Sequence, residues 1–100
     1  MTTTDYEQFV LSNWRGTEPG SLREAYIMAT GLGGETGEVL EWLKKDMRDG
    51  GRSPIALQLE LGDVLYYLTR LGLEYGFTLT SIMDANKEKL DARRTTGSGA

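Results

Sequence analysis

The chain has 100 residues, of which 26% are charged and 39% hydrophobic, and its formal net charge is −4. This length suits one domain, and a net acidic chain without a basic run argues against nucleic-acid binding. There is no Cys and no His, which excludes disulfides, thiolate or imidazole metal ligands and a Ser-His-Asp triad. Any chemistry must therefore use carboxylates, Lys, Arg and hydroxyl groups. No apolar run reaches the ~20 residues that span a membrane and no signal peptide is visible, so we expect a cytoplasmic protein.

Two capping boxes of the form S/T-x-x-E mark the first half of the chain. Thr4 with Glu7 predicts a helix over about residues 5–14, and Ser21 with Glu24 predicts a helix over about residues 22–48. The second segment contains the stretch GLGGETGE, which lacks the Gly-Lys-Ser/Thr ending of a P-loop and is preceded by no strand. We therefore expect this stretch inside the helix, at a cost of about 1 kcal/mol of helix propensity per glycine.

The second half of the chain predicts two further helices. Ser53 followed by Pro54 suits an N-cap and a first-turn proline for a helix over about residues 54–75. Thr78 suits the start of a helix over about residues 79–94. The polar, Gly- and Ser-containing residues 95–100 predict a disordered tail. Together these elements predict a single all-α domain over residues 1–94, an antiparallel helical bundle of about four helices.

Acidic residues lie within the apolar stripes of two of these helices. At about 100° per residue, Glu60 projects inside the apolar stripe of its helix, and Asp63 projects at the edge of the same stripe. Glu35 and Glu38 hold the equivalent positions on the preceding helix. Acids at this spacing often form solvated faces or pair with Lys and Arg, but the shared phase on two helices favours a joint role. An E-x-x-E facing an E-x-x-D is a suitable cage for a hard divalent cation such as Mg²⁺ or Mn²⁺.

The last predicted helix carries a polar and cationic face. Asn86, Lys89 and Arg93 project on one side of it. If this helix runs back along the preceding one, Lys89 and Arg93 lie about level with Asp63 and Glu60. Two interpretations remain open at this point. The cations neutralise the acids or complement the helix C-terminus, or they form a phosphate clamp beside a metal cluster.

Three segments together resemble a known family. These are GETGEVLEWLKK, ELGDVLYYLTRL and the later ANKEKLDAR. The combination resembles the MazG-like nucleotide pyrophosphohydrolases, an all-α superfamily, and the similarity runs from about Leu22 to Arg94. The resemblance implies Mg²⁺-dependent hydrolysis of a nucleoside triphosphate between its α- and β-phosphates, which gives a nucleoside monophosphate and pyrophosphate. Such an enzyme would remove unwanted nucleotides from the nucleotide pool.

The resemblance also implies roles for individual residues. The implied metal ligands are Glu35, Glu38, Glu60 and Asp63. The implied phosphate-binding residues are Lys89, Arg93 and Asn86. Because the chain has no His or Cys, we expect a carboxylate to activate the attacking water, and we assign this catalytic role to Glu38. Phe9, Trp14 and Trp42 are candidates for base stacking, and core packing is the alternative for Trp42.

Members of this superfamily associate as dimers or tetramers. The short first helix agrees with this, as do Gly33, Gly34 and Gly37, which project away from the acidic face and would allow close helix approach. We expect a homo-oligomer, with a tetramer favoured over a dimer, that binds neither nucleic acid nor membrane. A helical dimerisation or adaptor module with structural acids is the alternative function. A redox metal protein is disfavoured, because such bundle sites normally use E-x-x-H pairs.

Overall fold

A computed structural model describes residues 1–16 and 18–95, and over these residues the chain is helical with no strand. The helices are α1 (Thr3–Asn13), α2 (Leu22–Asp49), α3 (Pro54–Glu74) and α4 (Leu79–Thr95). The all-α class is confirmed, and every boundary lies within about two residues of its predicted position. The disordered tail was predicted over residues 95–100, but Thr95 is the last residue of α4, and residues 96–100 lie outside the described residues. Of the described helices, none is both long and apolar enough to cross a membrane.

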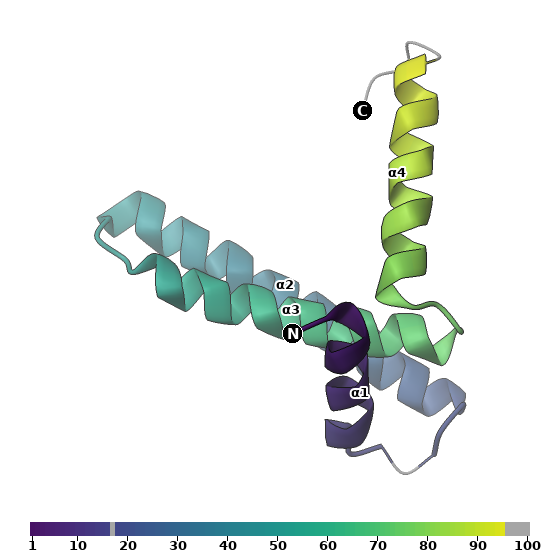
Figure 1. Cartoon of the computed structure of the whole chain (residues 1–100). Coiled ribbons are helices and arrows are strands. Elements are labelled where there is room, and N and C mark those ends of the chain that lie inside the picture. Colours follow the sequence, from purple (N-terminus) through teal and green to yellow (C-terminus); the bar gives the residue numbers. More distant parts are fainter. Residues whose placement is uncertain (17, 96–100) are drawn as a thin grey trace.

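The helices α2 and α3 form an antiparallel hairpin (Figure 1). The turn between them uses Gly50 and Gly51, whose φ angles of 70° and 73° strongly favour glycine. Ser53 then caps α3 as predicted, because its hydroxyl accepts a hydrogen bond from the backbone N–H of Ile55 at 3.3 Å. The stretch GLGGETGE lies inside α2, so its interpretation as helix rather than phosphate loop is confirmed.

The N-termini of α1 and α2 differ in detail from the predicted capping boxes. The cap of α1 is Thr2, which forms a reciprocal box with Asp5, so the assignment of the cap to Thr4 is wrong. The same T-x-x-acid pattern occurs two residues earlier, and an Asp completes it. Ser21 caps α2 as predicted by accepting from the Glu24 N–H at 3.1 Å. The Glu24 carboxylate, however, accepts a hydrogen bond from the indole of Trp14 at 3.1 Å instead of completing the box.

Helix α1 packs across α3 through aromatic and polar contacts. Asn13 donates a hydrogen bond from Nδ2 to the hydroxyl of Tyr66 at 3.0 Å, and the rings of Phe9 and Tyr66 meet edge to face with centroids 6.4 Å apart. The guanidinium of Arg70 lies 5.5 Å from the centre of the Trp14 ring. These contacts hold the end of α1 against the second half of α3, starting about one turn after Asp63.

Helix α4 departs from the predicted bundle. Figure 1 shows it standing away from the α2–α3 hairpin, with only its first turns close to α1 and α3. None of the residues in α4 is buried. The turn before α4 contains Gly76, whose φ is 81°, and it directs the helix outward instead of back along α3. The expectation that Lys89 and Arg93 lie level with Asp63 and Glu60 is therefore wrong within a single chain.

A single chain leaves much apolar surface uncovered. Over the described residues, Val10 and Met28 are the buried hydrophobic side chains. The accessible surface is 7213 Å², whereas a compact monomer of this mass exposes about 5,700 Å². The radius of gyration is 16.2 Å, against about 13 Å for a compact domain of 100 residues. The excess surface follows from the open arrangement of α4 and the hairpin.

Candidate metal and nucleotide site

Three of the predicted acids converge where α2 faces α3. Glu35, Glu60 and Asp63 each offer one carboxylate oxygen, and these oxygens lie within 4.8 Å of one another. Glu35 and Glu60 are half-buried and Asp63 is exposed. Glu60 and Asp63 are one turn apart on α3, so they share a face, and the hairpin sets Glu35 opposite them. The projection that placed one acid in each apolar stripe and a second at its edge agrees with this arrangement.

The electrostatics of this cluster favour a cation. The pKa of the Glu35 carboxyl is raised above its ordinary value, first by burial and then by the negative charges of Asp63, Glu60 and Glu38. Close carboxylates raise one another's pKa because each disfavours the ionised form of its neighbour. A divalent cation with oxygen ligands would remove this repulsion. The donor set therefore fits a hard metal ion such as Mg²⁺ or Mn²⁺.

Glu38 lies at the edge of the cluster, outside the three converging oxygens. Its side chain is exposed, yet it is close enough for its charge to raise the pKa of Glu35. This position leaves Glu38 in contact with solvent while it faces the cluster. An exposed carboxylate beside a metal cage can serve as a further ligand or as a general base.

An aromatic groove of about 420 Å³ adjoins the acids. It is lined by one face of α1, by the acids and by neighbouring tyrosines of α3, and it includes Tyr6, Phe9, Asn13, Asp63 and Tyr66. Burial raises the pKa of Tyr6, and the charges of Tyr66 and Asp63 raise it further, so the Tyr6 hydroxyl is within electrostatic reach of the acids. The volume lies within the ~300–1,000 Å³ usual for small-molecule sites.

Of the residues that the sequence suggested for base stacking, Phe9 lines this groove, whereas Tyr6, Asn13 and Tyr66 were missed. Trp14 lines a neighbouring groove of about 330 Å³ rather than the one beside the acids. The indole N–H of Trp42 is buried and has no hydrogen-bond partner among the described residues. This burial favours the core-packing alternative for Trp42 over base stacking. The spacing of Tyr6, Phe9 and Asn13 at i, i+3 and i+7 could have identified this side of the aromatic groove, because it places the three side chains on one face of α1.

The predicted phosphate-binding residues do not join the acids within one chain. Asn86, Lys89 and Arg93 are exposed on α4, which stands away from the hairpin (Figure 1). Their shared face on the helix is as predicted, but α4 does not carry that face to the cluster.

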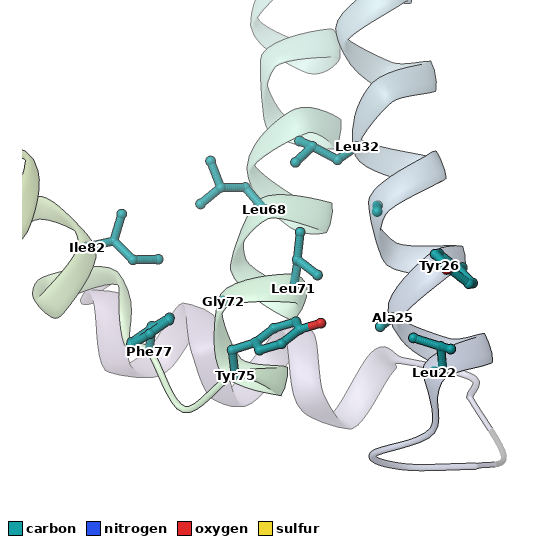
Figure 2. Close-up of a pocket in the computed structure, with 11 residues that line it drawn as sticks. Leu22, Ala25, Tyr26, Leu32, Leu68, Leu71, Gly72, Tyr75, Phe77 and Ile82 are labelled. Carbon is teal, nitrogen blue, oxygen red and sulfur yellow. The ribbon is translucent and has the colours of Figure 1, made fainter.

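A further groove is apolar and lies elsewhere. It measures about 500 Å³ and lies between the first half of α2, the end of α3 and the start of α4. Figure 2 shows Leu22, Tyr26, Leu68, Tyr75 and Phe77 along it. Among the described residues no charged side chain lines this groove, so the described chain provides no cation there to neutralise the charge of a triphosphate.

Comparison of the sequence with known proteins shows the family to which the chain belongs. The profile of the MazG nucleotide pyrophosphohydrolase domain matches residues 24–97. The chain belongs to this MazG family. A relative, the Gene 37 protein of Mycobacterium phage L5, is 35% identical over 82 residues, which cover 77% of this chain and 72% of the relative. No solved structure matches significantly. The match to the MazG domain includes all four predicted metal ligands and the cationic face of α4.

Proposed function

We propose that this MazG domain is a Mg²⁺-dependent pyrophosphohydrolase that cleaves a nucleoside triphosphate between its α- and β-phosphates. The products are a nucleoside monophosphate and pyrophosphate. The observation that carries the proposal is the convergence of the Glu35, Glu60 and Asp63 oxygens within 4.8 Å, in a chain of the MazG family. Removal of unwanted nucleotides from the pool is the role that such a reaction would serve.

The metal cage is the first part of the proposed mechanism. Glu35, Glu60 and Asp63 would hold the ion, and Glu38 would complete the cage from its edge. Bound Mg²⁺ would supply Lewis-acid polarisation of phosphoryl oxygens and neutralise part of their charge. The carboxylates and the triphosphate are both negatively charged, so without a cation the carboxylates would repel the substrate.

Glu38 is the proposed general base. Its carboxylate is exposed, so water has access to it, and it lies beside the three converging acids, where the phosphates would be bound. It accepts a proton from the attacking water as the new oxygen–phosphorus bond forms at the α-phosphorus, while the bond from the α-phosphorus to the α–β bridging oxygen breaks and that oxygen leaves with pyrophosphate. Asn86, Lys89 and Arg93 are the proposed phosphate clamp, and they hold the leaving pyrophosphate by hydrogen bonds and charge.

The aromatic groove is the proposed base site. Tyr6, Phe9 and Tyr66 offer ring faces and edges for stacking. The amide of Asn13 is oriented by its hydrogen bond to Tyr66, which leaves polar groups of the amide for the edge of a base. The groove continues from the acids along α1, so a nucleotide lying in it has its phosphates at Glu35 and Asp63.

We also propose that the domain functions as a homo-oligomer, with a tetramer favoured over a dimer. The supporting observations are the excess of about 1,500 Å² of accessible surface over a compact monomer and the exposed apolar groove (Figure 2). Stable interfaces bury about 800 Å² per partner, so the exposed surface is sufficient for at least one.

The test is pyrophosphate release from a panel of ribo- and deoxyribonucleoside triphosphates with Mg²⁺. We expect release from at least one nucleotide, loss of release when Mg²⁺ is chelated, and a loss of kcat of about 10²-fold or more in Glu38→Gln. Glu41→Gln is the matched control, because Glu41 lies on the same helix and pairs with Lys45 at 3.4 Å. No release from any nucleotide at high protein concentration would favour the adaptor-module alternative.

A further inference from the structure

A second groove, here called the Trp14 groove, opens where the segment after α1 meets α2 and α3. It measures about 330 Å³, and its lining includes Trp14, Arg15, Glu24, Tyr66 and Tyr67. This volume is within the ~300–1,000 Å³ usual for small-molecule sites. Among the described residues, Arg15 and Glu24 are the charged side chains of the groove, and the proposed mechanism gives neither of them a role.

Glu24 is nearly buried in this groove and is only half satisfied. The residue is 4% exposed, and within the described part of the chain it forms no ion pair. Its Oε1 accepts a hydrogen bond from the Trp14 indole at 3.1 Å, whereas its Oε2 accepts none from a described residue. The fully buried side-chain atoms that lack a partner, among the residues described, are Trp42 Nε1 and Arg70 Nε, so Glu24 Oε2 retains access to the groove. Such a carboxylate oxygen favours a ligand that brings hydrogen-bond donors to it.

The other walls of the Trp14 groove offer flat rings and a cation. The rings of Trp14 and Tyr67 meet edge to face with centroids 6.0 Å apart, and those of Tyr66 and Tyr67 do so at 5.6 Å. Arg15 lines the groove with an exposed side chain. Aromatic side chains bind flat heterocycles by stacking, and a guanidinium donates to two adjacent acceptors on the edge of a base. The groove therefore combines stacking surface, a carboxylate acceptor and a guanidinium donor.

Guanine is the base whose edges match these groups. Its N1–H and 2-amino group are adjacent donors that one carboxylate accepts together, and its O6 and N7 are the adjacent acceptors that arginine binds. The amino group of adenine or cytosine lies beside a ring nitrogen that is an acceptor, which a carboxylate disfavours. Uracil and thymine offer a single N–H between two carbonyl oxygens. Of the common bases, guanine therefore uses both Glu24 and Arg15 most fully.

The Trp14 groove lies in line with the acidic cluster. It shares Asn13, Tyr66 and Tyr67 with the aromatic groove beside the acids, so the two grooves adjoin. Glu24 precedes Glu35 by 11 residues, which places the two carboxylates on one face of α2, about 20° apart around the helix and about 16 Å apart along it. This separation is comparable to the length of an extended nucleotide, from metal-bound phosphates to the far edge of the base.

We propose that the Trp14 groove recognises guanine, so that guanine nucleotides are the preferred substrates. Glu24 accepts hydrogen bonds from N1–H and the 2-amino group, and Arg15 donates to O6 and N7. The base stacks on Tyr66 and Tyr67, which line both grooves, and its hydrogen-bonding edges extend into the Trp14 groove. The inference rests on the proposed function, since it assumes that the phosphates of the same nucleotide lie at the acids.

Binding of nucleoside monophosphates tests the site without any turnover. GMP, IMP and AMP are each titrated into the protein with Mg²⁺ and followed by isothermal titration calorimetry. IMP retains the N1–H, O6 and N7 of GMP but lacks the 2-amino group. We expect GMP to bind more tightly than AMP by about 10-fold or more, with IMP between them. Equal affinities for GMP and AMP, or no binding of GMP, would overturn the proposal.

Glu24→Gln separates guanine recognition from a structural role of Glu24. The amide oxygen can still accept from the Trp14 indole, but the amide NH₂ cannot accept from guanine, so the preference for GMP over AMP should fall about 10-fold or more. Glu18→Gln is the matched control, because Glu18 is an exposed acid of the same connecting segment, and it should keep the wild-type preference. A wild-type preference in Glu24→Gln overturns the proposal. If that variant does not fold, an unchanged GMP affinity in Arg15→Ala does so instead.

Turnover distinguishes a failure of this inference from a failure of the proposed function. We expect kcat/KM for GTP to exceed that for ATP by about 10-fold or more, and Glu24→Gln to remove most of this difference. A wild type that hydrolyses both nucleotides equally well would retain the proposed function and overturn guanine recognition. A wild type that hydrolyses neither but binds GMP selectively would refute the proposed function and support guanine recognition.

Discussion

Replacing Glu35 by Gln should raise the melting temperature of the metal-free protein and abolish its response to metal. The pKa of Glu35 is raised by burial and by its acidic neighbours, so the folded chain holds this proton more tightly than the unfolded chain. The contribution of Glu35 to stability is therefore most favourable below the unfolded pKa and declines as pH rises through the folded pKa. Near pH 7 the ionised group opposes folding, and a neutral amide removes this opposition.

The metal response has a calculable size. A ligand that binds only the folded state at ten times its Kd stabilises that state by about 1.4 kcal/mol. For a domain of this size, 1 kcal/mol corresponds to about 4–8 °C in melting temperature, so wild type should gain roughly 6–11 °C. Glu35→Gln removes one of the three converging ligands and part of the negative charge. We expect the gain at the same metal concentration to fall below about 2 °C.

Thermal unfolding followed by circular dichroism, with and without Mg²⁺ or Mn²⁺, measures both effects. Protein concentration must be constant, because the melting temperature of an oligomer depends on it. Glu41→Gln is the control, and it should respond to metal as wild type does. The higher melting temperature of metal-free Glu35→Gln relative to wild type should disappear below about pH 4, where residue 35 is neutral in both proteins. An unchanged wild-type melting temperature in metal, or a full metal response in Glu35→Gln, would refute the carboxylate cage.

Three further predictions address the parts around the cage. Gly31→Ala should lower the free energy of unfolding by about 1–3 kcal/mol, because a Cβ there would overlap the Tyr67 ring. Urea unfolding that shows no loss of stability would contradict this close contact. Glu7→Ala should lower the free energy of unfolding by about 1–2 kcal/mol and raise KM more than it lowers kcat. Glu7→Gln still offers an oxygen to the N–H of Leu79, so it should retain most of the stability and of the activity. Equal behaviour of the two variants would exclude a role of Glu7 in capping α4. Asn13→Ala should lower kcat/KM about 10-fold for the preferred nucleotide and less for others, and a uniform loss across the nucleotide panel would remove Asn13 from base recognition.

The positions of the helices and of the acids could be predicted from the sequence because the information is local. Capping residues, glycine breaks and the phase of the apolar stripes depend on neighbours within about one turn. They predicted α2 and α3, and an antiparallel hairpin with a modest stagger then brings Glu35 level with Glu60. The cap of α1 was misplaced because two overlapping patterns compete for it, and the pairing of Thr2 with Asp5 is the one that forms.

The direction of α4 could not be predicted in the same way. It depends on Glu7 reaching Leu79, across 72 residues of sequence, and on the fit of Ile82 against Gly72. Nothing in the local pattern around Glu7 distinguishes a cap of a distant helix from the capping-box acid that it resembles. The aromatic groove was anticipated only through Phe9 for a related reason, since Tyr6 and Asn13 face the acids only once α1 packs across α3.

The glycines of GLGGETGE allow a test of whether a second copy of the chain packs against the outer side of α2. Gly33, Gly34 and Gly37 are exposed, and a Cβ at any of them would meet no atom within 4 Å. Each costs the helix about 1 kcal/mol relative to alanine, so in an isolated chain Gly33→Ala should be stabilising. In an assembly where a second copy packs on this side, the added Cβ would hold the two surfaces apart. We expect Gly33→Ala to weaken self-association by about 10-fold or more in sedimentation equilibrium, while Gly62→Ala, which also meets no atom within 4 Å, leaves it unchanged. If Gly33→Ala instead stabilises the protein and leaves association unaltered, the outer side of α2 faces solvent, and the second copy must approach through the apolar groove of Figure 2.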